Sequence, residues 1–244
     1  MKRMVIVLAG LATLTGCGIE LDTDPVPSSR TFAHAGGELT VEADLGKLRI
    51  EPGAAAQVQV ERRLRGKAAR DGNNSWELKD GVLRLHARCE MVVGDCGADY
   101  TVRVPPDVEL TVRGGDDPVS VVRLSGRVTV TTTGGAIRTS GLAGPLEART
   151  AEGSISAVRT RSGEVVARTR DGGITLAFAA PPTRVEAISE TGPVRAELPE
   201  ADYRITADSE TGKARSELRD AGPRSRRAVV ARSVDGDVRL TRSP

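Results

Sequence analysis

The segments SETGPVRAEL (189–198) and SETGKARSEL (209–218) are near copies of one another that begin 20 residues apart. In each, a Ser stands three residues before a Gly, and apolar or small residues alternate with polar ones after the Gly. Alternation with a period of two is typical of a β-strand with one buried face. The glycine can adopt the positive φ of a tight corner, and nearby Ser, Thr or Asp side chains can hydrogen-bond the turn backbone. The two segments therefore predict a repeated unit of one short strand and one corner.

The same pattern recurs every nine to eleven residues from residue 126 onward, apart from one interval of 15 residues before Arg227. Alternate copies share the Ser or Thr before the Gly, so the full unit contains two strands. Such a strand cannot bury its apolar face alone, and neighbouring copies must stack. We predict an all-β, single-domain β-solenoid with two strands per coil of 19–20 residues, right-handed as parallel crossovers usually are. Because short turns also make hairpins, an antiparallel β-sandwich or meander is the alternative.

The alternation also predicts which side chains point into the core. One inward position is bulky and the next is usually small, as a narrow stack requires. The predicted inward residues are Val128, Val130, Ile137, Thr139, Leu146, Ala148, Ile155, Ala157, Val165, Ala167, Ile174, Leu176, Val185, Ala187, Val194, Ala196, Ile205, Ala207, Ala214, Ser216, Val229, Ala231, Val238 and Leu240. Within a repeat domain expected over residues 31–244, the part 113–244 is regular. The part 31–112 is interrupted at residues 61–80, and we expect it to form a hairpin-like cap.

The N-terminus has the features of an export signal. Lys2 and Arg3 precede an apolar run, residues 4–14, that is too short to span a bilayer. The next residues, Leu-Thr-Gly-Cys17, resemble the lipobox of bacterial lipoproteins, which implies removal of residues 1–16 and acylation of Cys17. Residues 17–30 are polar with two prolines, and we expect a flexible tether. The predicted protein is exported and lipid-anchored on the extracytoplasmic face of the cell membrane, the alternative being an ordinary signal peptide with an incidental Cys17.

Export decides the expectation for the other two cysteines. Disulfides persist in an oxidising compartment, so we expect Cys89 and Cys96 to be bonded. The loop is short, and the chain-entropy model gives a stabilisation of about 2.5 kcal/mol. A metal site would need more ligands than these cysteines and the two histidines of the chain supply. No metal or other cofactor is expected.

A lipobox followed by stacked S-x-x-G-x-V-x-A strands is similar to the bacterial β-strand-repeat proteins called putative adhesins, or toastrack domains. The resemblance covers about residues 31–244. It implies a solenoid-like all-β fold in a cell-envelope protein. It implies no catalytic residues, because that family has none established, and some of its members belong to envelope-stress sensing systems.

Outward positions of one strand series carry arginines that would form a ladder able to bind phosphate or carboxylate polymers. The ladder consists of Arg138, Arg195, Arg215 and Arg239. Glu197 and Glu217 follow two residues after an arginine on the same face, so the alternative is a solvated face that neutralises itself. The adjacent pair Asp116 and Asp117 could hold Ca²⁺, but an exposed turn before Pro118 is the commoner explanation of such a pair.

Composition and charge exclude several classes of function. Aromatic residues make up 2% of the chain, which disfavours a bulky enzyme core and the aromatic platforms of sugar-cleaving β-helix enzymes. After removal of residues 1–16, basic and acidic residues balance, so nucleic-acid binding through bulk charge is not expected.

We expect a non-catalytic, membrane-anchored binding or adhesion-like module for an envelope polymer or protein. The alternatives are a signalling accessory that partners a membrane protein and, less favoured, a polysaccharide-cleaving enzyme. An exposed end strand could also pair with a second copy, so self-association is a further expectation.

Overall fold

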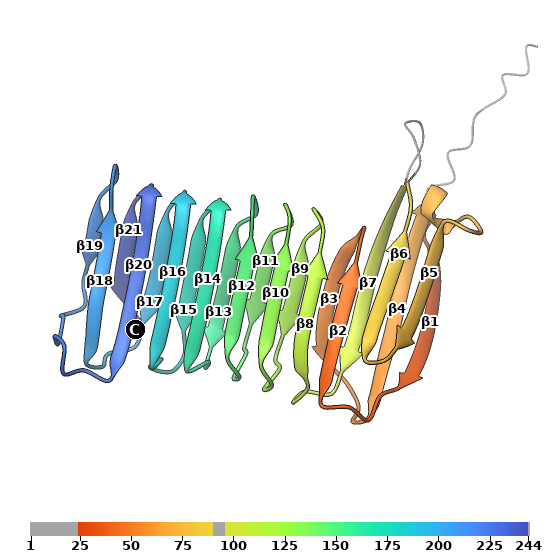
Figure 1. Cartoon of the computed structure of the whole chain (residues 1–244), viewed down its shortest axis with the longest axis horizontal. Coiled ribbons are helices and arrows are strands. Elements are labelled where there is room, and N and C mark those ends of the chain that lie inside the picture. The colour runs from red at the N-terminus through yellow and green to blue at the C-terminus, as the bar shows by residue number, and fades with distance from the viewer. Residues whose placement is uncertain (1–23, 90–95, 244) are drawn as a thin grey trace, which may run out of the picture.

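Two β-sheets face each other along an elongated stack in the computed structural model, which describes residues 24–89 and 96–243 (Figure 1). Sheet A contains, in spatial order, β1 (Val26–Ala33), β4 (Gln57–Gly66), β7 (Cys96–Val104), β3 (Lys47–Pro52), β9 (Val119–Val122), β11 (Ile137–Ser140), β13 (Ile155–Thr160), β15 (Ile174–Phe178), β17 (Val194–Leu198), β21 (Val238–Arg242) and β19 (Ala214–Ser216). Sheet B contains β5 (Asn74–Lys79), β6 (Val82–Ala87), β2 (Glu38–Ala43), β8 (Glu109–Gly114), β10 (Val128–Thr132), β12 (Leu146–Thr150), β14 (Glu164–Asp171), β16 (Arg184–Thr191), β20 (Arg227–Asp235) and β18 (Tyr203–Ser209). The only helical element of the described chain is a 3₁₀ turn at Lys67–Ala69.

The chain alternates between the sheets, one strand in each per coil, and neighbouring coils pair in parallel, which confirms the predicted β-solenoid. Val128 pairs with Leu110 on one side and with Leu146 on the other, and Leu146 pairs with Val165. These register partners are 18, 18 and 19 residues apart, close to the coil length expected from the sequence. The antiparallel alternative applies only to the N-terminal end, where β1 pairs with β4, β4 with β7 and β5 with β6.

Several of the Ser and Thr residues that precede the repeat glycines bond across coils. The hydroxyl of Ser189 donates to the Gly172 carbonyl at 2.8 Å, and that of Ser233 donates to the Gly192 carbonyl at 2.9 Å. The corner glycines form a column in which the Cα of each glycine after the first lies against the carbonyl of the glycine before it, in the order Gly135, Gly153, Gly172, Gly192, Gly236 and Gly212. The S-x-x-G pattern therefore encodes contacts between coils as well as the turn within one coil.

The predicted inward residues form the core in every coil except one. Most are almost fully buried between the two sheets. The exceptions all lie in β18 and β19: Ile205 and Ala207 are half-buried, and Ala214 and Ser216 are exposed. This coil is the last in space, so one side of its inward side chains has no further coil to pack against.

Spatial order departs from sequence order at the C-terminal end. The β20–β21 coil lies between the β16–β17 coil and the β18–β19 coil, as the blue strands of Figure 1 show. The near-copy segments 189–198 and 209–218 are therefore not neighbours. The 15-residue interval seen in the sequence contains residues 217–226, which carry the chain across the open end and back into the stack.

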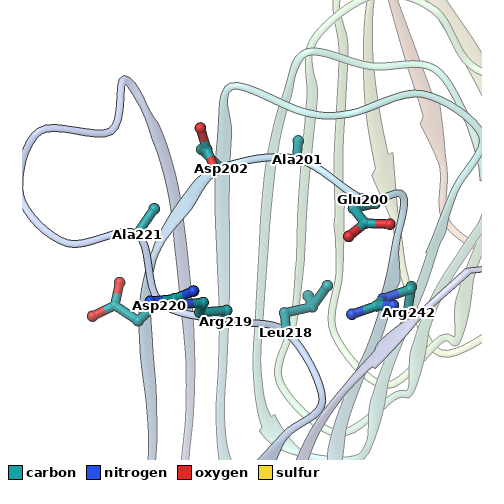
Figure 2. Close-up of a pocket in the computed structure, with 8 residues that line it drawn as sticks. All are labelled: Glu200, Ala201, Asp202, Leu218, Arg219, Asp220, Ala221 and Arg242. Atoms are coloured by element: carbon teal, nitrogen blue, oxygen red, sulfur yellow. The ribbon is translucent and has the colours of Figure 1, made fainter.

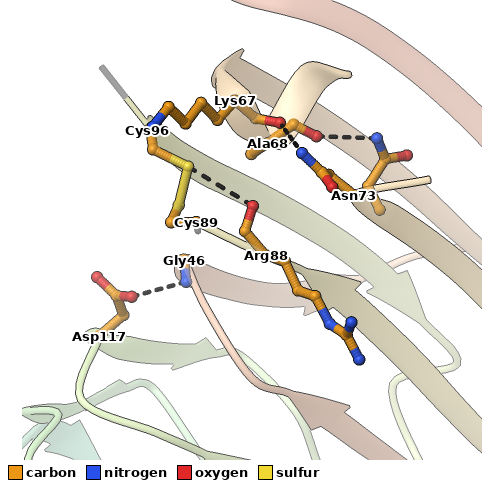
Figure 3. Close-up of a disulfide and its surroundings, with 9 residues drawn as sticks. Gly46, Lys67, Ala68, Asn73, Arg88, Cys89, Cys96 and Asp117 are labelled. Carbon is orange, nitrogen blue, oxygen red and sulfur yellow. Dashed lines mark hydrogen bonds between the residues drawn. A yellow bond between two sulfur atoms is a disulfide. The ribbon is translucent and has the colours of Figure 1, made fainter. Parts of the chain in front are cut away.

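The N-terminal end supplies one correction and one confirmed prediction. Residues 26–30 belong to β1, where they pair with β4, so the prediction of a tether through residue 30 is wrong for this part. An extended polar segment can pair with an available sheet edge whatever its periodicity. The predicted disulfide is present between Cys89 and Cys96 and links the end of β6 to the start of β7 (Figure 3). The predicted signal peptide and Cys17 lie outside the described residues.

Candidate ligand-binding face and groove

The outer face of sheet B is largely neutralised by its own ion pairs. Arg84 contacts Glu42 at 3.3 Å and Glu77 at 3.9 Å, and Arg113 contacts Glu42 at 2.8 Å. Farther along, Glu186 is bonded by two arginines. Although burial acts to raise its pKa, hydrogen bonds from Arg168 and Arg184 hold the pKa of the Glu186 carboxyl below its ordinary value. Ion pairs of this kind explain how the outer face of sheet B can carry many charged side chains and remain stable in contact with solvent.

Sheet A carries the arginine ladder predicted from the sequence, but in a different order. Arg239 lies between Arg195 and Arg215, and the three occupy neighbouring strands in register. Arg138 is not part of this group, because Ser156 and Thr175 separate it from Arg195.

The local neutralisation expected for this ladder is incomplete. Arg239 contacts Glu217 at 3.5 Å. Arg195, Arg215 and Arg138 form no ion pair with any residue in the described part of the chain. The C-terminal half of sheet A therefore presents a row of cations with one acidic partner in contact.

A groove of about 630 Å³ lies on the same sheet at the ends of β9, β11 and β13. We call it the corner groove. Four arginines line it, Arg49, Arg123, Arg159 and Arg161, and no acidic side chain does. The remaining lining residues are uncharged and include Ser120 and Ser140.

Three equivalent corner positions on successive coils form the centre of this groove. Arg123, Gly141 and Arg159 have φ values of 53°, 68° and 51°. The Arg123 amide donates to the Ser140 carbonyl at 2.9 Å, and the Gly141 amide donates to the Val158 carbonyl at 3.0 Å. The Arg159 guanidinium donates to the Ser140 hydroxyl at 2.8 Å. Sequence reasoning missed these arginines, although the repeat-equivalent Gly141 was the signal that this position has a positive φ.

A second hollow, of about 520 Å³, lies at the C-terminal end, between the β17–β18 and β19–β20 loops (Figure 2). Its lining mixes acidic residues such as Glu200 and Asp202 with Arg219 and Arg242. One of its lining residues, Asp220, accepts hydrogen bonds from the backbone amides of Ile205 and Gly222, both at 3.0 Å. The loop that carries Asp220 therefore covers part of the exposed edge of β18, and we assign it a structural role.

The acidic pair considered for Ca²⁺ has a structural role as well. A carboxylate oxygen of Asp117 accepts a hydrogen bond from the Gly46 amide at 2.7 Å, which joins two neighbouring corners (Figure 3). Within residues 24–89 and 96–243, no group of three His, Cys, Asp or Glu side chains is arranged to hold a metal ion. His86 instead pairs with Asp44 at 2.5 Å on sheet B. In the same residues, no helix is both long and apolar enough to cross a membrane.

Comparisons with known proteins concern the fold. No protein-family model matches the sequence, and no curated protein matches it. Among solved structures, the chain matches one from Bacteroides fragilis NCTC 9343 described as a putative adhesin, at 12% identity and a TM-score of 0.50, over 89% of this chain and 97% of that one. It also matches a putative cell adhesion protein from Clostridium sporogenes ATCC 15579, at 10% identity and a TM-score of 0.39, over 90% and 100% of the two chains. A structure from Parabacteroides distasonis ATCC 8503, described as a putative lipid binding protein, matches at 9% identity and a TM-score of 0.45, over 89% and 97%. The chain therefore has the all-β repeat fold seen in the B. fragilis structure described as a putative adhesin.

Proposed function

We propose that the protein is a non-catalytic binding module of the bacterial cell envelope that presents sheet A to an anionic polymer. The observation that carries this proposal is the row of Arg195, Arg239 and Arg215, which occupy neighbouring strands of sheet A in register. Arg239 contacts Glu217 at 3.5 Å, and Arg195 and Arg215 form no ion pair with a described residue. Guanidinium groups held on a rigid sheet match the oxygens of phosphate and carboxylate groups. The description of the B. fragilis structure as a putative adhesin agrees with this role.

Attachment to the membrane through Cys17 is the second part of the proposal. The lipobox-like sequence before Cys17 supports it, as does the position of residues 1–23 ahead of the first described strand. A bacterium expressing the full chain and fed radiolabelled palmitate should incorporate label into this protein and retain it in the membrane fraction. Cys17→Ser should abolish labelling and release the protein from the membrane. Equal labelling of the two chains would refute lipid attachment at this residue.

Binding is tested with the full chain in detergent and envelope material from the expressing bacterium. We expect envelope polymer to co-sediment with the protein. The double variant Arg195→Ala with Arg215→Ala should bind at least fivefold more weakly. A matched control is Arg204→Ala with Arg232→Ala, which removes two exposed arginines from sheet B. An equal loss of binding in both variants would mean that the effect comes from the total positive charge of the protein and not from the position of the arginines. Recovery of one stoichiometric membrane protein and no polymer would instead support the signalling-accessory alternative.

A further inference from the structure

We propose that the corner groove is a binding site for a linear, non-aromatic polymer that carries repeated phosphate or carboxylate groups. This inference rests on the proposed binding function and names a specific site for it. The site differs from the arginine ladder at the C-terminal end of sheet A, because its central residues lie at the ends of β9, β11 and β13: Arg123 and Gly141 follow their strands, and Arg159 is the penultimate residue of β13.

The charge of the groove points to an anionic ligand. Of its four arginines, Arg49 contacts Glu51 at 3.1 Å. Arg123, Arg159 and Arg161 form no ion pair with any residue that the structure describes, and the groove lining contains no carboxylate. Arginine forks bind phosphate and carboxylate oxygens in a bidentate manner, and a partly enclosed groove strengthens such contacts relative to an open surface. The arrangement is therefore complementary to clustered anions.

Backbone strain gives an independent reason to assign a role to Arg123 and Arg159. Both adopt the left-handed conformation, which non-glycine residues rarely occupy and which costs conformational energy. The equivalent residue in the coil between them, Gly141, has the same conformation without that cost. The corner therefore does not need arginine for its fold. Strained backbone conformations that a fold retains are concentrated at functional sites such as binding sites. Here the two strained residues are arginines, one on each side of Gly141, which has no side chain.

The spacing favours a polymer over a single small anion. Arg123 and Arg159 lie two coils apart, which corresponds to about 10 Å between their backbones at the usual strand spacing. Within 4 Å, a Cβ added at Gly141 would meet only the Cγ of Arg123, at 3.5 Å, so no third side chain crowds the position between the two arginines. A chain with anionic groups at successive units could contact both. No aromatic side chain lines the groove, which argues against stacking of nucleic-acid bases.

The decisive variant is Arg123→Gly combined with Arg159→Gly. Glycine relieves the strained φ at both positions, so the unfolding midpoint should stay the same or rise, while two of the arginines are removed. Binding of polyphosphate and of polygalacturonate to the full chain in detergent is measured by calorimetry at fixed salt. We expect the wild-type chain to bind at least one of the two, and the variant to bind it at least tenfold more weakly. The preferred probe assigns the anion as phosphate or carboxylate.

Two further variants separate binding in the corner groove from a general effect of positive charge. Arg204→Ala with Arg232→Ala removes the same charge from sheet B and should change the affinity less than twofold. Arg123→Lys with Arg159→Lys keeps the charge but loses the fork, and an intermediate affinity is expected. Unchanged binding in the double glycine variant overturns the site, even where envelope polymer still co-sediments and the proposed function stands. If the wild-type chain binds neither probe, the site is overturned as well. If the wild-type chain binds no envelope polymer, the proposed function itself is refuted.

Discussion

At the scale of single residues, the repeat depends on glycines that leave no room for a side chain. A Cβ on Gly153 would lie 2.4 Å from the Gly135 carbonyl oxygen, a distance that forces the backbones of two coils apart. We predict that Gly153→Ala lowers the free energy of unfolding by about 3 kcal/mol, within the range measured for overpacked sites. Urea unfolding followed by circular dichroism measures this change.

Gly37→Ala is the matched control for that substitution. A Cβ at Gly37 would meet no atom within 4 Å, so its free energy of unfolding should change by less than about 0.5 kcal/mol. Equal destabilisation of the two variants would show that loss of glycine, and not contact between coils, determines the effect.

At the scale of elements, the segment after β19 covers the end of the stack and depends on one carboxylate. Hydrogen bonds from the Ile205 and Gly222 amides lower the pKa of the Asp220 carboxyl below its ordinary value. The folded state therefore binds this proton less readily than the unfolded chain does. The stabilisation is present above the ordinary pKa and is lost as the pH falls through the lowered folded-state value.

We predict that the Ile205 amide exchanges its proton faster, relative to other amides of β18, when the pH is lowered below about 4. Hydrogen exchange monitored by NMR across that range measures the change. Asp220→Asn keeps an acceptor oxygen but has no carboxyl to protonate, so its Ile205 amide should show no such pH dependence. A pH response of the same size in the variant would assign the titration to another group.

At the scale of the whole molecule, the features that could be predicted from the sequence are those that are local and periodic. Alternation predicted the strands, the coil length and nearly all of the core, and the export signal led to the expectation that Cys89 and Cys96 are bonded. It could not predict that β20 inserts between β16 and β18, because all three strands present similar inward residues and any of them could pair with the next. Arg123 and Arg159 were missed for a related reason: their role depends on a groove formed by three coils, and one coil shows only an arginine after a strand.

The same insertion leads to a prediction about the assembly of the stack. Removing residues 203–226 would join the turn after β17 directly to β20, which already pairs with β16. The remaining turn, 199–202, is similar in length to the turn 179–183 between β15 and β16, so the shortened chain can close without strain. We predict that it folds cooperatively with β20 and β21 as its last coil, and that its urea m-value falls because less surface is buried. Backbone NMR shifts of residues 120–190 should stay unchanged. Widespread shifts or aggregation would mean that the displaced β18–β19 coil, with Asp220 over its edge, is a cap that the solenoid requires.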